Sequence, residues 1–329
     1  MSTRRNSDPS TLIESARAGN RAALARLLTL VENGSREVSA LAFKTPGHAY
    51  TVGVTGAPGA GKSTLTDRLI VMAREKGFDG GDQVAVLAID PSSPFSGGAI
   101  LGDRVRMQNH ALDEKVFIRS MATRGHLGGL AVAVPDAVRL LSSVGLPIVF
   151  VETVGVGQQE VEVAAATDTT IVVVNPGWGD AIQANKAGLL EIADLFVINK
   201  SDRPGARETK RDLELMLDLG AVGEWRPPIV ETVASTGEGV EALWAAIGDH
   251  RSHLSAQGTL ESLRRARLDR EFHQILLARV EQQIDRAVTL DRFAVIIATM
   301  MAGDLDPYEA ADRLLAGMFT DGPGPSADA

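Results

Sequence analysis

The stretch from Gly56 to Ser63 decides the fold class of this chain, and it reads Gly-Ala-Pro-Gly-Ala-Gly-Lys-Ser. This is the pattern G-x-x-x-x-G-K-[ST] of a phosphate-binding loop, whose glycines let successive backbone N–H groups point at phosphate oxygens. In that pattern Lys62 brings a positive charge to the β- and γ-phosphates, and Ser63 offers its hydroxyl to Mg²⁺. The residues expected to bind the phosphates are Gly56, Ala57, Pro58, Gly59, Ala60, Gly61, Lys62, Ser63 and Thr64.

The sequence on both sides of this loop fits the motif. Residues 50–55 predict a short buried strand, and Leu65, Leu69 and Met72 recur at helical spacing until Gly77. A strand, a loop and a helix in this order are what a phosphate-binding loop requires, so a chance glycine-rich turn is disfavoured.

Short apolar runs alternate with helical segments between residues 50 and 252. The runs are continuous and rich in Val and Ile, which is typical of strands buried on both faces of a parallel sheet. We therefore predict an α/β fold with a mostly parallel central sheet flanked by helices. The predicted strands are Thr51–Thr55, Val84–Asp90, Pro147–Thr153, Thr170–Pro176, Leu195–Lys200 and Pro228–Val233.

The two ends of the chain have helical patterns instead. Asp8-Pro9 predicts a helix start, and a second helix is expected to end near Gly34. From Thr259 apolar residues recur with a period near 3.6, and a further helix is expected from Pro307 to about Phe319. The predicted division is residues 1–48 as an N-terminal helical extension, 49–255 as the nucleotide-binding domain, 256–320 as a C-terminal helical arm and 321–329 as a disordered tail.

Composition excludes several classes of protein. The net charge of −9 argues against a nucleic-acid partner, which needs a basic face. The absence of cysteine excludes disulfides and thiolate metal sites. No apolar stretch reaches the length of about 18 residues that a membrane span needs, and no signal peptide is evident, so we expect a cytoplasmic protein.

A second motif indicates which base the nucleotide carries. Asn199-Lys200-Ser201-Asp202 matches N-K-x-D, the guanine-reading motif of GTPases, and it follows a predicted strand. The Asp202 carboxylate can accept hydrogen bonds from guanine N1–H and the 2-amino group, whereas adenine would leave it unpaired. Asn199 can brace the base and Lys200 can cover it. The backbone of Val233, Ala234 and Ser235, after the next strand, is expected to donate to the guanine oxygen.

Acidic residues at other strand ends are candidates for the γ-phosphate side. Glu152 begins the sequence Glu-Thr-Val-Gly155, where many GTPases have Asp-x-x-Gly, so Glu152 is expected to serve Mg²⁺ and Gly155 to contact the γ-phosphate. Asp90 and Asp103 flank a Gly/Ser-rich loop and are candidates for metal binding or for orienting water, although a turn followed by a helix cap also fits. We assign no role to His126 in the loop from Arg124 to Gly129.

Together these motifs closely resemble the MeaB/ArgK family, GTPases of the SIMIBI class. The most specific segment is Ser96-Gly-Gly-Ala-Ile-Leu-Gly-Asp103-Arg. The resemblance implies a Mg²⁺-dependent GTPase, with GTP or GDP bound, that acts as a chaperone for an adenosylcobalamin-dependent methylmalonyl-CoA mutase. It also implies a homodimer joined by the C-terminal arm, and a coupling loop carrying Gln183 and Lys186. Lys62, Asp90, Asp103 and Glu152 become the expected catalytic residues.

Two other functions use the same loop. A metal-insertion GTPase usually carries Cys or clustered His ligands, and this chain has no Cys and no His cluster. A small-molecule kinase, as in the arginine/ornithine transport name once given to the family, has no need for guanine selectivity.

Overall fold

The computed structural model describes residues 8–91, 108–110, 112–123, 129–153, 159–177, 191–219, 224–288 and 291–320. The chain divides into two compact units, Met1–Glu271 and Phe272–Ala329. Asp103, Gly155, Gln183 and Lys186 lie outside the described residues, as does residue 126.

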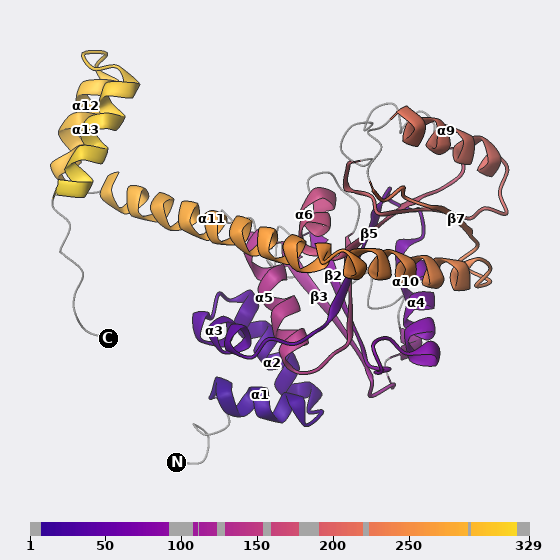
Figure 1. Cartoon of the computed structure of the whole chain (residues 1–329). Helices are drawn as coiled ribbons and strands as arrows, with labels where there is room; N and C mark the ends of the chain where they lie inside the picture. The colour runs from indigo at the N-terminus through magenta and orange to yellow at the C-terminus, as the bar shows by residue number, and fades with distance from the viewer. Residues whose placement is uncertain are drawn as a thin grey trace. The chain divides into compact units, whose positions relative to one another are not determined.

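The first unit is built on a central sheet with helices around it (Figure 1). The sheet has seven strands in the order β3-β2-β4-β1-β5-β6-β7. All six strand pairs are parallel, which confirms the predicted fold class. The carboxyl ends of all seven strands therefore meet at one edge of the sheet. The strands are β1 (Tyr50–Gly56), β2 (Val84–Pro91), β3 (Val116–Thr123), β4 (Ile148–Thr153), β5 (Thr169–Val174), β6 (Leu195–Asn199) and β7 (Ile229–Thr232).

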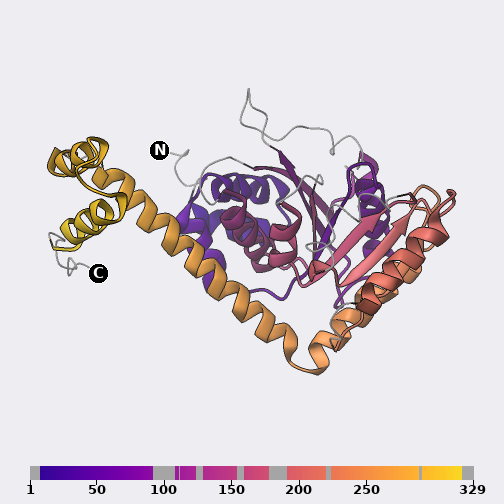
Figure 2. The same ribbon diagram turned by 90° about the horizontal axis from the view of Figure 1, so that it is seen from above.

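Helices cover both faces of this sheet (Figure 2). α4 (Lys62–Lys76) and α10 (Val240–Ala256) bury their apolar side chains against one face. α5 (Gly129–Ser143) packs on the opposite face, together with Val163 of α6 (Gln159–Ala166). α9 (Ala206–Leu219) covers β5 and β6, where Val172 and Val174 face it while Ile171 and Val173 face the α4 side. This alternation is the ordinary consequence of side chains pointing to opposite sides of a strand.

The N-terminal segment forms three helices, α1 (Pro9–Arg17), α2 (Arg21–Glu32) and α3 (Arg36–Lys44). The predicted start at Asp8 is confirmed, because its carboxylate accepts from Thr11 N at 3.1 Å and caps α1. α3 was not predicted.

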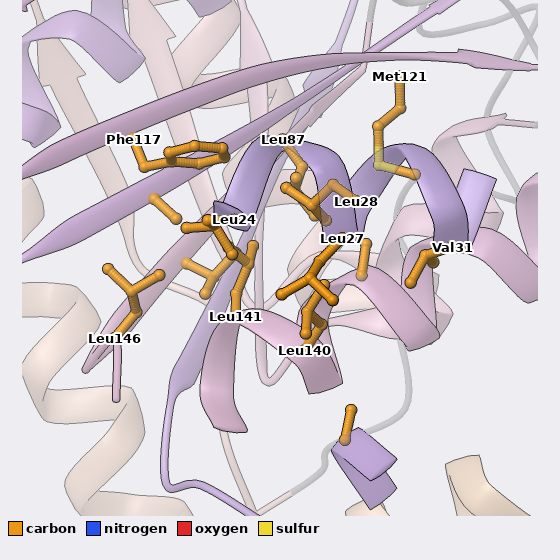
Figure 3. Close-up of a cluster of buried hydrophobic side chains, with 14 of the residues drawn as sticks. Leu24, Leu27, Leu28, Val31, Leu87, Phe117, Met121, Leu140, Leu141 and Leu146 are labelled. Carbon is orange, nitrogen blue, oxygen red and sulfur yellow. The ribbon is translucent and has the colours of Figure 1, made fainter. Parts of the chain in front are cut away.

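α2 contributes an apolar stripe to a core that it shares with the sheet and α5 (Figure 3). The residues labelled in this core are Leu24, Leu27, Leu28, Val31, Leu87, Phe117, Met121, Leu140, Leu141 and Leu146.

β3, the strand at one edge of the sheet, was not predicted from the sequence. Its centre carries Arg119 and Ser120, so it does not read as a continuous apolar run. The Arg119 guanidinium pairs with Glu32 on α2 at 2.5 Å. An edge strand borders other elements on one side only and can carry such polar side chains.

A buried carboxylate lies at the amino edge of the sheet, opposite the strand ends expected to bind nucleotide. The side chain of Asp168, just before β5, is only 1% exposed. Arg264, on α11 (Thr259–Val288), binds both of its oxygens at 3.2 and 2.7 Å, and Arg267 binds one at 2.7 Å. Burial alone would raise the pKa of Asp168, but the two guanidinium groups outweigh burial and lower it.

A second polar chain lies at the same edge. The Tyr50 hydroxyl is 2.6 Å from the Thr169 hydroxyl, which is 2.9 Å from Nδ1 of His250. Nε2 of His250 lies 3.4 Å from Oδ1 of Asp194. Burial lowers the pKa of His250 to about 4 and raises that of Asp194 to about 6, because burial disfavours the charged form of each group.

The second unit contains the distal half of α11, α12 (Asp291–Met301) and α13 (Pro307–Thr320). The predicted helix from Pro307 is confirmed, and Asp306 caps it by accepting from the amides of Tyr308 and Glu309. α12 was not predicted. Phe293 of α12 is buried and lies against Gly317, where a Cβ would come within 2.8 Å of its ring.

Candidate nucleotide-binding site

The phosphate-binding loop connects β1 to α4 at the carboxyl edge of the sheet. Gly56, Gly59 and Gly61 adopt positive φ angles of 128°, 73° and 93°, a region that glycine occupies readily. Close packing adds a second constraint at Gly56, because a Cβ there would lie 2.0 Å from the Val173 carbonyl oxygen. The strand, loop and helix required by the motif are therefore present, with glycine where the backbone demands it.

Lys62 and Ser63 occupy the first turn of α4 and are both buried. The Lys62 ammonium donates to the carbonyl oxygens of Gly56 and Ala57, at 2.8 and 3.0 Å, so it lies within the curl of the loop. The Ser63 hydroxyl donates to Oε1 of Glu152 at 2.6 Å. Glu152, on β4, is 2% exposed. A hydroxyl and a carboxylate side by side are the hard oxygen ligands that Mg²⁺ prefers, so the residues fit a magnesium ion.

Asn199 connects the phosphate-binding loop to the loop after β7. Its side-chain amide donates to the Ala60 carbonyl at 2.7 Å, and its oxygen accepts from the Ala234 amide at 3.0 Å and the Thr232 hydroxyl at 3.2 Å. A Cβ on Gly61 would lie 2.3 Å from Nδ2 of Asn199, so this close approach also depends on glycine. The asparagine of the predicted guanine motif thus braces two loops at once.

The rest of the guanine motif forms a turn after β6. Lys200 has a φ of 61°, which is uncommon for a residue with a side chain, and its ammonium donates to the Gly59 carbonyl at 2.7 Å. Both the amide and the hydroxyl of Ser201 donate to the Thr232 carbonyl at 3.1 Å. Asp202 is exposed in this turn, so its carboxylate is accessible to a ligand.

Arg68 joins this site although sequence reasoning assigned it no role. It lies on α4, six residues after Lys62, and donates to the carbonyl oxygens of Ala234 at 2.9 Å and Ser235 at 2.7 Å. The contact spans more than 160 residues of sequence, and its only local signal is a long cationic side chain on the helix after the phosphate-binding loop.

Of the remaining candidates for the γ-phosphate side, Asp90 is the one whose backbone the structure describes. Asp90 lies near the carboxyl end of β2, which pairs with β4 up to Ile89 and Thr153, so its backbone is close to the Glu152 strand end. Lys62, Ser63, Glu152, Asn199, Lys200, Asp202 and residues 233–235 are brought together at the carboxyl edge.

A family comparison decides what kind of protein has this site. The family model described as "Methylmalonyl Co-A mutase-associated GTPase MeaB" matches residues 24–289. This chain belongs to the MeaB family. The MeaB assignment agrees with the predicted resemblance, and it makes the protein a GTPase that binds guanine nucleotides.

Individual relatives agree with the MeaB assignment. A protein of Pyrococcus abyssi is 49% identical over 92% of this chain and 95% of its own length. The GTPase ArgK of Escherichia coli is 39% identical over 77% of this chain and 80% of its own. The mitochondrial "Methylmalonic aciduria type A homolog" of Mus musculus is 33% identical over 90% of this chain and 76% of its own.

A solved structure shares the fold of this MeaB family member. It is a "LAO/AO transport system kinase", which is 28% identical to this chain with a TM-score of 0.68. The match covers 94% of this chain and 97% of the solved chain. In the described part of the chain, no helix combines the length and apolar character that a membrane crossing requires.

Proposed function

We propose that this GTPase is a chaperone of an adenosylcobalamin-dependent acyl-CoA mutase of the methylmalonyl-CoA mutase type, assisting cofactor loading and protecting the mutase. The observation that carries the proposal is the family match over residues 24–289, whose description names association with methylmalonyl-CoA mutase. The name of the mouse relative points to methylmalonate metabolism as well. We place the protein in the cytoplasm.

The proposed nucleotide contacts follow from the geometry at the carboxyl edge. The backbone N–H groups from Gly56 to Thr64, apart from Pro58, which has none, and the Lys62 ammonium would bind the phosphates. This requires Lys62 to exchange its two carbonyl partners for phosphate oxygens. Asp202 would accept from guanine N1–H and the 2-amino group. Asn199 connects the phosphate-binding loop to the base loop, which is residues 233–239 between β7 and α10, and Lys200 binds the phosphate-binding loop as well.

We propose Ser63, Asp90, Asp103 and Glu152 as the residues that hold Mg²⁺ directly or through water. The ion, when bound, would neutralise charge that develops on the transferred phosphoryl oxygens. Glu152 holds the Ser63 hydroxyl in place from the neighbouring strand, since the two oxygens are 2.6 Å apart. Gly155 would report the γ-phosphate through its amide.

Base recognition is tested by replacing one carboxylate oxygen of Asp202 with an amide nitrogen. Asp202→Asn should weaken binding of GTP and favour xanthosine triphosphate, because the 2-oxo group of xanthine accepts a hydrogen bond where guanine donates one. Competitive binding of GTP, ATP and xanthosine triphosphate measures this. Equal affinity of the wild-type protein for ATP and GTP would contradict the proposed base site.

The partner is tested through hydrolysis. We expect slow intrinsic GTP hydrolysis that accelerates when the mutase binds, because a partner can order loops that the free GTPase leaves incomplete. Gln183→Ala with Lys186→Ala should leave GTP affinity and basal turnover near wild type while removing this stimulation. Full stimulation of the double variant would show that this loop is not the coupling element, and a mutase that never stimulates the wild type would refute the partner.

We also propose a homodimer formed through the C-terminal arm, residues 256–320. Phe272, Leu276 and Val280 recur every fourth residue on α11 and are 59%, 47% and 39% exposed. Repeated apolar side chains on one helix face commonly mark an interface, and a second copy supplies the same face in return. Phe272→Glu with Leu276→Glu should convert a dimer into a monomer in light scattering. A wild-type monomer at micromolar concentration would refute the dimer.

A further inference from the structure

Arg68, on α4, binds the loop that follows β7. Its guanidinium donates from Nε to the Ala234 carbonyl at 2.9 Å and from Nη2 to the Ser235 carbonyl at 2.7 Å. Two donors of one rigid, planar group therefore bind two successive carbonyls. Ala234 is 2% exposed, so this part of the loop is packed against the body of the domain.

The amide groups of the same loop are almost all committed to protein partners. The Val233 amide donates to Glu238 O at 3.0 Å, and the Ala234 amide donates to Oδ1 of Asn199 at 3.0 Å. The amides of Thr236 and Gly237 both donate to Val233 O, at 3.0 and 2.9 Å. Within the part of the chain that the structure describes, the Ser235 amide has no acceptor, and Ser235 is exposed.

The peptide bond connects these two observations. The carbonyl of Ala234 and the amide of Ser235 belong to one planar trans peptide, so the two groups point in opposite directions. By binding that carbonyl, Arg68 fixes the direction in which the Ser235 N–H points. The bond from the charged guanidinium also polarises the peptide, which strengthens the N–H as a donor.

We propose that Arg68 is a positioning residue for guanine specificity, which orients the Ser235 amide to donate to the 6-oxo group of the base. This rests on the proposed base site around Asp202. The Ala234 amide is already used by Asn199, so the Ser235 amide is the group in residues 233–235 that remains to bind this oxygen. Asp202 and Ser235 then read different groups of guanine, the 2-amino group and the 6-oxo group.

The experiment separates these two contacts with nucleotide analogues. Full-length wild type and Arg68→Met are compared in dissociation constants for GDP, for 6-thio-GDP, whose sulfur is a weaker acceptor, and for inosine diphosphate, which lacks the 2-amino group. In the variant, the preference for GDP over 6-thio-GDP should fall by about three- to tenfold, the worth of one hydrogen bond. Its preference for GDP over inosine diphosphate should stay at the wild-type value.

Two control variants make the result specific. Arg74→Met removes a second arginine of α4, whose partners Asp82 and Asp113 lie outside the base loop, and it should change neither preference. Arg68→Lys can still donate to one carbonyl and should recover part of the preference for the 6-oxo group.

The possible outcomes distinguish the proposals. If Arg68→Met keeps the wild-type preference for GDP over 6-thio-GDP, or weakens all three nucleotides by the same factor, Arg68 has no role in reading the 6-oxo group. A wild type that binds GDP and 6-thio-GDP equally overturns the inference too. If Asp202→Asn leaves the preference for GDP over inosine diphosphate unchanged, the base site itself is wrong.

Discussion

Replacing Asp168 by Asn should strongly destabilise the first unit, because it removes the charge that two arginines share. Asp168 is 1% exposed, while Arg264 and Arg267 are 29% and 19% exposed. Removing one partner of a buried ion pair costs about 3–5 kcal/mol, and partial solvation of the arginines favours the lower end. With about 2–4 °C per kcal/mol for a unit of this size, the thermal midpoint should fall by about 6–12 °C.

The pH dependence of this effect has a defined sign. The pKa of Asp168 is lowered in the folded protein, so its contribution to stability is present above the unfolded value of about 3.9 and is lost as pH falls through the folded value. The difference between wild type and Asp168→Asn should therefore be constant from about pH 8 to pH 5 and shrink only below about pH 4.

Thermal unfolding followed by circular dichroism measures the effect, with two comparisons. Glu309→Gln removes an exposed ion pair with Arg313 and should lower the midpoint by about 2 °C or less. Arg264→Met and the double variant Arg264→Met/Asp168→Asn complete a double-mutant cycle. The cycle should give a coupling free energy of about 1 kcal/mol or more between Arg264 and Asp168. Additive effects, or a midpoint shift below about 2 °C for Asp168→Asn, would show that the buried charge does not stabilise the first unit as proposed.

Three further predictions concern the nucleotide site and the amino edge of the sheet. Lys62→Ala should nearly abolish nucleotide binding in a titration with fluorescent GDP, and near-normal affinity would mean that another cation binds the phosphates. Asp103→Ala and Glu152→Ala should slow Mg²⁺-dependent GTP hydrolysis more than they weaken GDP binding; wild-type rates in both variants would remove them from the metal site. Burial raises the pKa of Asp194 to about 6, so its proton stabilises the fold at low pH and this contribution is lost as pH rises through about 6. Asp194→Asn should therefore gain stability relative to wild type as pH rises from about 4 to about 6 and keep that gain at higher pH, and a pH-independent difference in thermal midpoint would contradict the shift.

The parts of the fold that the sequence predicted are those with strong local patterns. The strands near the centre of the sheet, such as β1 and β4, are buried on both faces and read as continuous apolar runs. β3 was missed because its position at the edge allows Arg119 and Ser120 in its centre. The short helices α3 and α12 were missed as well, since few turns give a weak periodic signal.

The residues of the candidate site also fall into those that the sequence predicts and those that it does not. Gly56–Ser63 and Asn199–Asp202 could be predicted because their chemistry lies in contiguous residues, whose spacing the ligand itself dictates. Arg68 and the Asp168 cluster could not, because their contacts join residues that are 96 to 167 positions apart. Nothing in the sequence near Arg68 distinguishes its side chain from any other solvated arginine on a helix.

These long-range contacts explain how the phosphate and base ends of the site are held in register. Asn199 binds Ala60 on the phosphate-binding loop and Ala234 on the base loop, so its amide fixes their separation from inside. Arg68 binds the base loop from α4, the helix that also presents Lys62 and Ser63. The two braces act on adjacent peptides of one short loop. At the proposed base site a guanine nucleotide would therefore meet donors whose directions are already set, and less of its binding energy would go into ordering the loop.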